Sequence, residues 1–161
     1  MPLLAVLTVL LLLVAFTVFF GPPYVPVLRG NMQAAFELLQ LKPGQTMLEL
    51  GSGDGRVLIA AARQGIHVVG IELSPLLVLL SWLRTRRYRK YVKIIWGNYF
   101  TVAWPEADAI FAFMIQRHMG KLDKRITRWH THPVRLASVA FEVPGKHADA
   151  KAYGVFLYRY K

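Results

Sequence analysis

The chain has 161 residues, enough for one domain with a substantial hydrophobic core. It contains no cysteine, which excludes a disulfide framework, a thiolate zinc site and a cysteine nucleophile. Its formal net charge of +11 favours anionic partners, such as a phospholipid surface, nucleic acid or an acidic protein face.

An uncharged apolar run from Leu3 to Phe20 begins the sequence, with two threonines as its only polar residues. As a helix it would be about 27 Å long, close to the hydrocarbon thickness of a bilayer. The alternative is a cleaved signal peptide. However, no Lys or Arg precedes the run, and Phe19-Phe20 stand where a cleavage site needs small residues. We therefore expect residues 1–21 to form a retained transmembrane anchor.

All Lys and Arg residues follow this run. The positive-inside rule then predicts a single-pass membrane protein with the bulk of the chain in the cytoplasm, or on the matrix side in an organelle. Residues 22–30 are rich in proline and read as a linker. Residues 31–161 are left to form the folded domain.

Helical and strand patterns alternate through that domain, which predicts an α/β fold with a mostly parallel sheet covered on both faces. Asn31 would cap a first short helix. The elements expected after it are strand 46–50, helix 56–63, strand 67–72, helix 75–87, strand 92–96, strand 109–114, helix 117–129, strand 134–143 and strand 153–160. The stretch 143–153 is too short for a crossover helix and another strand. We therefore expect a reduced sheet, with one strand missing or vestigial.

A glycine turn, Glu-Leu-Gly-Ser-Gly-Asp-Gly-Arg at residues 49–56, joins the first strand to its helix. Its alternate glycines permit positive φ and a close approach of the backbone to a ligand. The following helix points its free N–H groups at the same place, and Glu49 adds a carboxylate where a cation could sit. Arg56 stands where a dinucleotide fingerprint needs glycine. The spacing instead resembles motif I of the class I, seven-β-strand, S-adenosylmethionine-dependent methyltransferases.

Other polar residues follow the strands at distances that suit an adenosyl ligand. Glu72 ends the second strand and could accept hydrogen bonds from both ribose hydroxyls, or it could be a surface carboxylate that caps the next helix. Asn98 could accept from the adenine amine or serve as a turn residue, and Leu73 and Tyr99 could flank the adenine. Asp54 could contact the methionyl amino group or cap the helix that begins at Arg56.

A second resemblance is more specific. The stretches Pro-Tyr-Val-Pro at 23–26, Leu-Glu-Leu-Gly-Ser-Gly-Asp-Gly-Arg-Val-Leu-Ile-Ala-Ala-Ala at 48–62, Gly-Ile-Glu-Leu-Ser-Pro at 70–75 and Leu-Asp-Lys-Arg at 122–125 resemble small membrane-anchored protein-lysine methyltransferases. That family includes the mitochondrial enzyme acting on the c-type subunit of ATP synthase. The resemblance implies that Tyr24 folds over the methionyl end of the cofactor. The expected cofactor-binding residues are Tyr24, Glu49, Gly51, Ser52, Gly53, Asp54, Gly55, Glu72, Leu73, Asn98 and Tyr99, with no metal.

The resemblance implies in-line methyl transfer from S-adenosylmethionine to a lysine of a membrane or membrane-proximal protein. Such transfer needs alignment and desolvation, so we expect no catalytic triad. The alternatives are a small-molecule or lipid acceptor, a non-catalytic membrane scaffold with this fold, and an RNA methyltransferase. We interpret His118, His130 and His132 as solvated surface residues.

A basic cluster follows the helix expected at 75–87, with two interleaved tyrosines. Its members are Arg84, Arg86, Arg87, Arg89, Lys90 and Lys93. Given the expected anchor, we rank docking to anionic lipid first, a solvated helix end second and RNA binding third. Nucleic acid is therefore not an expected partner.

Overall fold

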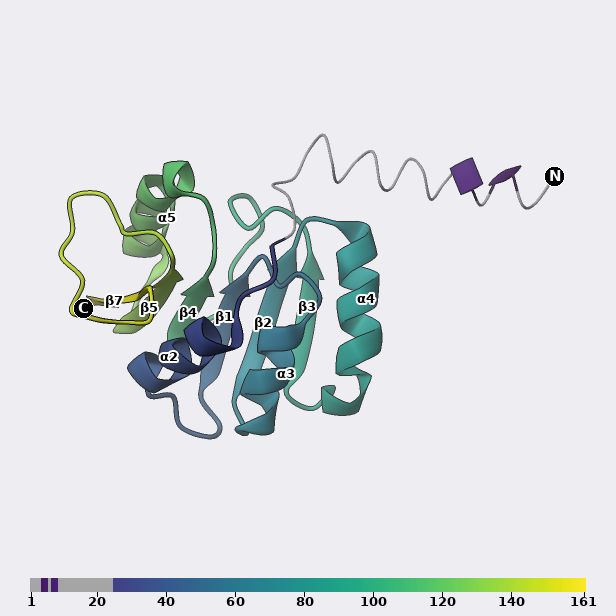
Figure 1. Cartoon of the computed structure of the whole chain (residues 1–161), viewed down its shortest axis with the longest axis horizontal. Coiled ribbons are helices and arrows are strands. Elements are labelled where there is room, and N and C mark those ends of the chain that lie inside the picture. The colour runs from purple at the N-terminus through teal and green to yellow at the C-terminus, as the bar shows by residue number, and fades with distance from the viewer. Residues whose placement is uncertain (1–3, 6, 9–24) are drawn as a thin grey trace.

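A seven-stranded sheet forms the centre of the computed structural model, in the order β3-β2-β1-β4-β5-β7-β6 (Figure 1). The structure describes residues 4, 5, 7, 8 and 25–161. The strands are β1 (Thr46–Leu50), β2 (His67–Glu72), β3 (Val92–Trp96), β4 (Ala109–Ala112), β5 (Val134–Val139), β6 (Ala150–Ala152) and β7 (Val155–Tyr160). β1 to β5 run parallel, while β7 is antiparallel to both β5 and β6.

Helices cover both faces of this sheet. They are α2 (Arg29–Leu39), α3 (Arg56–Arg63), α4 (Pro75–Thr85), the short 3₁₀ helix η1 (Arg86–Tyr88) and α5 (Gln116–Trp129). α2 and α3 pack on one face and α5 on the other, while α4 lies beside α3 and packs on β3 at the edge (Figure 1). The predicted α/β class with two covered faces is confirmed.

Alternation along the strands explains why both faces are buried. In β1, Met47 enters the core cluster under α2 and α3, whereas Leu48 and Leu50 enter the cluster under α5. Successive strand side chains point to opposite faces, so an apolar strand such as β1 supplies two cores at once. This arrangement fixes the carboxyl ends of β1, β2 and β3 next to one another, because all three strands are parallel.

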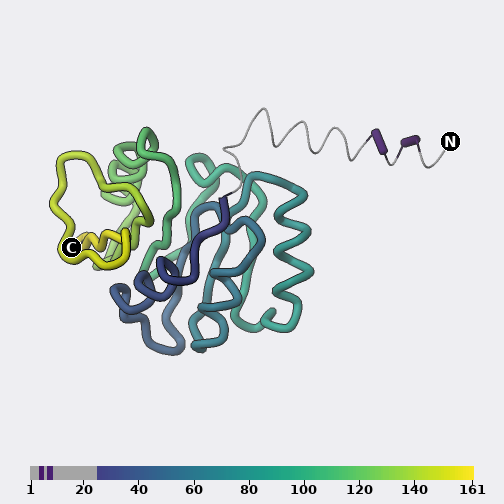
Figure 2. Tube along the Cα trace, viewed as in Figure 1, coloured from purple at the N-terminus to yellow at the C-terminus, as the bar shows by residue number. Residues whose placement is uncertain are grey.

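The expectation of a missing strand was wrong, because β6 completes seven strands, whereas the alternative of a vestigial strand agrees with the shortness of β6. β6 has only three residues, and the ten-residue loop 140–149 reaches it without a helix (the yellow-green bulge beside the C-terminus in Figure 2). A short strand at the edge needs no full crossover helix to cover it. Instead, the connections are reduced: residues 97–108 between β3 and β4 also contain no helix.

The expected cap at Asn31 was also wrong. α2 begins at Arg29, its N-cap residue is Leu28, and no side chain caps it. The Asn31 amide lies inside the first turn and donates to the backbone carbonyl of Tyr153, in the turn between β6 and β7. This contact joins segments more than a hundred residues apart, so local sequence signals did not reveal it.

The anchor expected at residues 1–21 lies outside the described residues, apart from residues 4, 5, 7 and 8, which are helical. Tyr24 lies outside them as well. Within the described part of the chain, no helix has the length and apolar character required to cross a bilayer.

Candidate functional site

The loop between β1 and α3 depends on its three glycines. Gly51, Gly53 and Gly55 have φ angles of 86°, 53° and 77°, all in the left-handed region that side chains disfavour. Gly55 is the N-cap residue of α3, so the helix begins directly where the loop ends. The helix N-terminus therefore faces the carboxyl edge of the sheet, as the sequence predicted.

Glu72 holds this loop in place. Its Oε2 accepts the Gly53 N–H at 2.8 Å and its Oε1 accepts the Ser74 N–H at 2.8 Å. The side chain is 8% exposed. A carboxylate has about four lone-pair positions, so each oxygen keeps capacity for one more donor. The carboxylate thus organises both the glycine loop and the start of α4 while remaining able to accept two further hydrogen bonds.

Two close approaches hold the glycine loop 51–55 against β2 on one side and α4 on the other. A Cβ at Gly70 of β2 would lie 2.7 Å from the Cβ of Ser52, and a Cβ at Gly55 would lie 2.6 Å from Oγ of Ser81. Gly70 and Ser81 were not among the predicted site residues. The available signals were a glycine inside a strand pattern and a serine inside an apolar helix.

These contacts predict different costs for the same substitution at two loop glycines. Gly55→Ala combines a left-handed backbone with a collision against Ser81, so we expect it to lower the free energy of unfolding by about 2–5 kcal/mol. Gly51→Ala meets no heavy atom within 4 Å and should cost only about 1–2 kcal/mol. Urea denaturation of both variants would test this ordering, and equal losses would contradict it.

Three carboxylates gather around the loop. Glu49 is 4% exposed and its Oε2 has no hydrogen-bond partner among the described residues. Burial raises the pKa of Glu49 well above its ordinary value, and the charges of Glu72 and Asp54 raise it further. An uncompensated buried carboxyl is costly, so this group favours either a bound proton or a cationic ligand.

Asp54 has arginine partners from both neighbouring helices. Its carboxylate accepts the Arg56 backbone N–H at 3.2 Å and pairs with the guanidinium groups of Arg56 and Arg84. The bond to the first N–H of α3 agrees with the cap interpretation, although Gly55 is the N-cap residue. Arg84 of α4 thereby ties that helix to the loop, a contact that the sequence did not predict.

Asn98, Tyr99 and Leu73 lie at or just beyond the ends of β2 and β3. The Asn98 Oδ1 accepts the Phe100 N–H at 2.8 Å, which is the turn role considered for it. Burial raises the pKa of Tyr99, and the charge of Glu72 contributes, so the two side chains are electrostatic neighbours. The Leu73 carbonyl accepts from the Trp96 indole at 3.0 Å.

The interpretation of the three histidines as solvated surface residues was wrong, because all three are half-buried. His130 Nδ1 lies 2.8 Å from the Ile126 carbonyl and His132 Nε2 lies 3.1 Å from the Ala107 carbonyl, so both have structural partners. His118 stacks edge-on against Phe100, and its Nδ1 is buried without a partner in the described structure. Burial, with Arg117 and Lys121, lowers its pKa, which favours a neutral ring.

Comparison with known proteins agrees with this geometry. The profile of the ANTKMT methyltransferase domain matches residues 49–150. The chain is 30% identical over 126 residues to the ATP synthase c-subunit lysine N-methyltransferase of Homo sapiens, and the match covers 76% of this chain and 53% of that protein. It is 25% identical over 127 residues to a protein-lysine N-methyltransferase of Saccharolobus islandicus, covering 76% and 79%. The chain thus spans about half the length of the human relative.

Among solved structures, the fold is similar to an RNA methyltransferase from Salinibacter ruber in complex with S-adenosyl-L-homocysteine. The TM-score is 0.76 at 25% identity, and the match covers 84% of this chain and 92% of that one. The family profile begins at Glu49 and includes the glycine loop and Glu72. Because that profile spans most of the folded domain, the chain belongs to the ANTKMT methyltransferase domain family.

Proposed function

We propose that this protein is an S-adenosylmethionine-dependent protein-lysine N-methyltransferase whose cofactor seat is the loop 51–55 with Glu49 and Glu72. The observation that carries this proposal is the buried carboxyl of Glu49, whose Oε2 has no hydrogen-bond partner among the described residues. It lies beside a loop that has empty space at the Cβ position of Gly51. A methyl donor that ends in a positively charged amino group could pair with that carboxylate. The lysine acceptor is supported by the curated relatives, two of which are named above as lysine methyltransferases.

The chain's own residues divide the binding task. The remaining acceptor capacity of Glu72 suits the two ribose hydroxyls, and the exposed backbone at Gly51 lets the ligand approach without a Cβ in the way. In this proposal Leu73 and Tyr99 flank the adenine, and Asn98 lies near its amine. Tyr24, from the resemblance, would close over the methionyl end.

The cofactor supplies an activated methyl group, so the protein chiefly aligns the acceptor and excludes water. A lysine acceptor must lose its proton, and near neutral pH this costs about 4–5 kcal/mol for an ordinary lysine. Burial among aromatic side chains lowers that cost. Phe100 and His118, which are in contact with each other, are candidates to line this approach, since the lowered pKa of His118 favours its neutral form.

We further propose that residues 1–21 anchor the protein in a membrane and that its substrate lysine lies near the bilayer. The length and composition of the apolar run support this, and the downstream basic residues favour a cytoplasmic or matrix-side domain. A lysine close to a bilayer is partly desolvated already, which lowers its pKa. Anionic lipid would also offset the repulsion between a positive enzyme and a positive substrate.

The test is incubation of the full chain with membranes and S-adenosylmethionine carrying a labelled methyl group. We expect a labelled protein band that yields methyl-lysine on hydrolysis, and we expect Gly53→Arg to abolish it because the side chain would fill the loop. Gly30→Arg is the matched control, since its Cβ position is open and lies outside the loop. It should retain the label.

The other reactions give distinct results in the same experiment. Label in the lipid fraction would replace the lysine proposal with a lipid acceptor. Label in added RNA would favour RNA methylation, as in the structural neighbour from Salinibacter ruber. Absence of cofactor binding by calorimetry would leave a non-catalytic membrane scaffold.

A further inference from the structure

The fully buried residues of α4 are polar, and most of its large apolar side chains are exposed. Its buried residues are Ser81 and Thr85. Its exposed residues include four leucines and a tryptophan, each between 40% and 53% exposed: Leu76, Leu79, Leu80, Trp82 and Leu83. This is the reverse of a helix that faces water on its outer side.

The exposed leucines form one continuous stripe. Positions 76, 79, 80 and 83 follow the i, i+3, i+4, i+7 spacing that places side chains on one helical face. α5 shows the usual arrangement in the same protein, because Met119, Leu122 and Ile126 are buried and most of its basic residues are exposed. The α4 stripe is therefore a local feature and does not reflect a generally apolar surface.

The contacts on the inward face of α4 explain why polar residues are buried there. Ser81 packs against Gly55 at the start of α3, and the Thr85 hydroxyl donates to the Ser81 carbonyl at 2.8 Å. Small side chains are required there because the helix approaches the glycine loop closely. Leu77 is half-buried on this inward side, and the other four leucines of α4 lie on its outer face.

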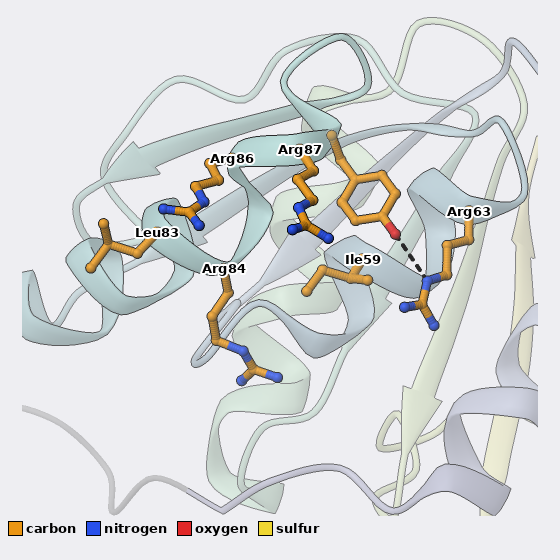
Figure 3. Close-up of a pocket in the computed structure, with 7 residues that line it drawn as sticks. Ile59, Arg63, Leu83, Arg84, Arg86 and Arg87 are labelled. Carbon is orange, nitrogen blue, oxygen red and sulfur yellow. Dashed lines mark hydrogen bonds between the residues drawn. The ribbon is translucent and has the colours of Figure 1, made fainter.

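Basic residues stand at the C-terminal end of the stripe. A hollow of about 320 Å³ between α3 and the end of α4 is lined by Leu83 and by four arginines: Arg63, Arg84, Arg86 and Arg87. In Figure 3, Arg84 and Arg86 lie on the side of Leu83, and Arg63 lies on the opposite side. Arg63 donates to the Tyr88 hydroxyl at 3.1 Å, and Arg84 pairs with Asp54. Arg86 and Arg87 are exposed.

Tryptophans flank the stripe at both ends. The guanidinium carbon of Arg89 lies 4.8 Å from the centroid of the Trp82 ring. Trp96, 64% exposed at the end of β3, donates to the Leu73 carbonyl just before α4 begins. Tryptophan suits a membrane–water boundary because one end of the ring system is apolar and the other can hydrogen-bond.

We propose that the outer face of α4 lies in the interface of an anionic phospholipid membrane, with the leucine stripe among the acyl chains and the arginines at the phosphates. Leucine and tryptophan on one side with arginines at the rim are the composition of an interfacial helix. A parallel two-fold contact with a second copy of this chain would bring two arginine clusters together, whereas phosphate groups of lipid would neutralise them. The proposed membrane docking of α4 does not depend on whether the protein transfers methyl groups. It would, however, place the membrane beside the glycine loop, since α4 begins three residues after Glu72.

The test uses tryptophan fluorescence of the full chain on vesicles whose acyl chains carry bromine, which quenches tryptophan on contact. All four tryptophans lie beyond residue 81, so residues 1–21 contribute no signal even if they bind the membrane. We expect quenching in phosphatidylglycerol vesicles and a marked reduction of it in Trp82→Phe, with the remainder coming from Trp96. Leu79→Ser combined with Leu83→Ser should abolish the quenching of Trp82. Leu28→Ser, at another exposed leucine, should leave it intact.

Charge is tested by a matched pair of double variants. Arg86→Gln with Arg87→Gln should weaken α4 docking to phosphatidylglycerol vesicles about 30-fold, the ordinary worth of two basic residues near such a surface. Lys124→Gln with Arg128→Gln on α5 removes the same charge elsewhere and should have little effect. A chain that floats with the vesicles while Trp82 stays unquenched would overturn the proposal. A dimer broken by the Leu79 and Leu83 changes, without quenching, would replace it with self-association. Cofactor binding by the same variants is measured separately and decides the methyltransferase proposal alone.

Discussion

Replacing Glu72 with glutamine is expected to lower the free energy of unfolding by about 2–4 kcal/mol and to weaken S-adenosylmethionine binding at least about 100-fold. The carboxylate accepts the N–H groups of Gly53 and Ser74, both at 2.8 Å. Glutamine keeps one acceptor and points an amide N–H₂ at the other donor, so one buried N–H loses its partner. The charge that would hold the two ribose hydroxyls is lost as well.

Glu106→Gln is the control for this substitution, because it makes the same chemical change on an exposed side chain. It should change stability by less than about 0.5 kcal/mol and leave binding unaltered. Urea denaturation and calorimetric titration with the cofactor measure the two effects. If Glu72→Gln binds the cofactor as tightly as the wild type, Glu72 has no ribose role and its function is to hold the loop.

Replacing Glu49 with glutamine should change the pH dependence of stability. The pKa of Glu49 is raised in the folded protein, chiefly by burial and then by Glu72 and Asp54. As the pH rises above the ordinary carboxyl value of 4.5, the unfolded chain releases this proton before the native protein does. The free energy of unfolding therefore falls with rising pH until Glu49 ionises in the native state. Glu49→Gln removes this fall. The free energy of unfolding of the variant, relative to that of the wild type, should therefore increase with pH over this range.

Cofactor binding should respond in the opposite direction. A ligand with a cationic end binds the ionised carboxylate, so wild-type affinity should increase with pH and binding should release a proton. Glu49→Gln should lose about 1.5–3 kcal/mol of binding free energy, roughly 10- to 150-fold, and should release no proton from this site. Titration calorimetry in two buffers of different ionisation enthalpy measures that release. Equal proton release by both proteins would contradict a cation role for Glu49.

Much of the fold could be predicted because its signals are local. The bounds of β1, β2, β3 and α3 agree with those expected, since each is a short periodic apolar segment ended by glycine or a polar residue. The apolar side chains of β1 already implied a strand buried on both faces. Ala150–Ala152 was missed because three residues carry no period, and β6 forms only through its pairing with β7.

The sequence by itself determined the α/β class, the glycine loop at 51–55 and the carboxylate at the end of β2, since these depend on backbone conformation and on spacing along the chain. The tertiary structure decided which partners those groups have. It brought Arg84 to Asp54, aligned Glu72 with the Gly53 N–H and pressed Ser81 against Gly55. It also left four leucines of α4 exposed, while Ser81 occupies the place where that helix comes closest to the loop. These contacts join residues that are 19 to 30 positions apart in the chain, and no local pattern of residue types specifies them.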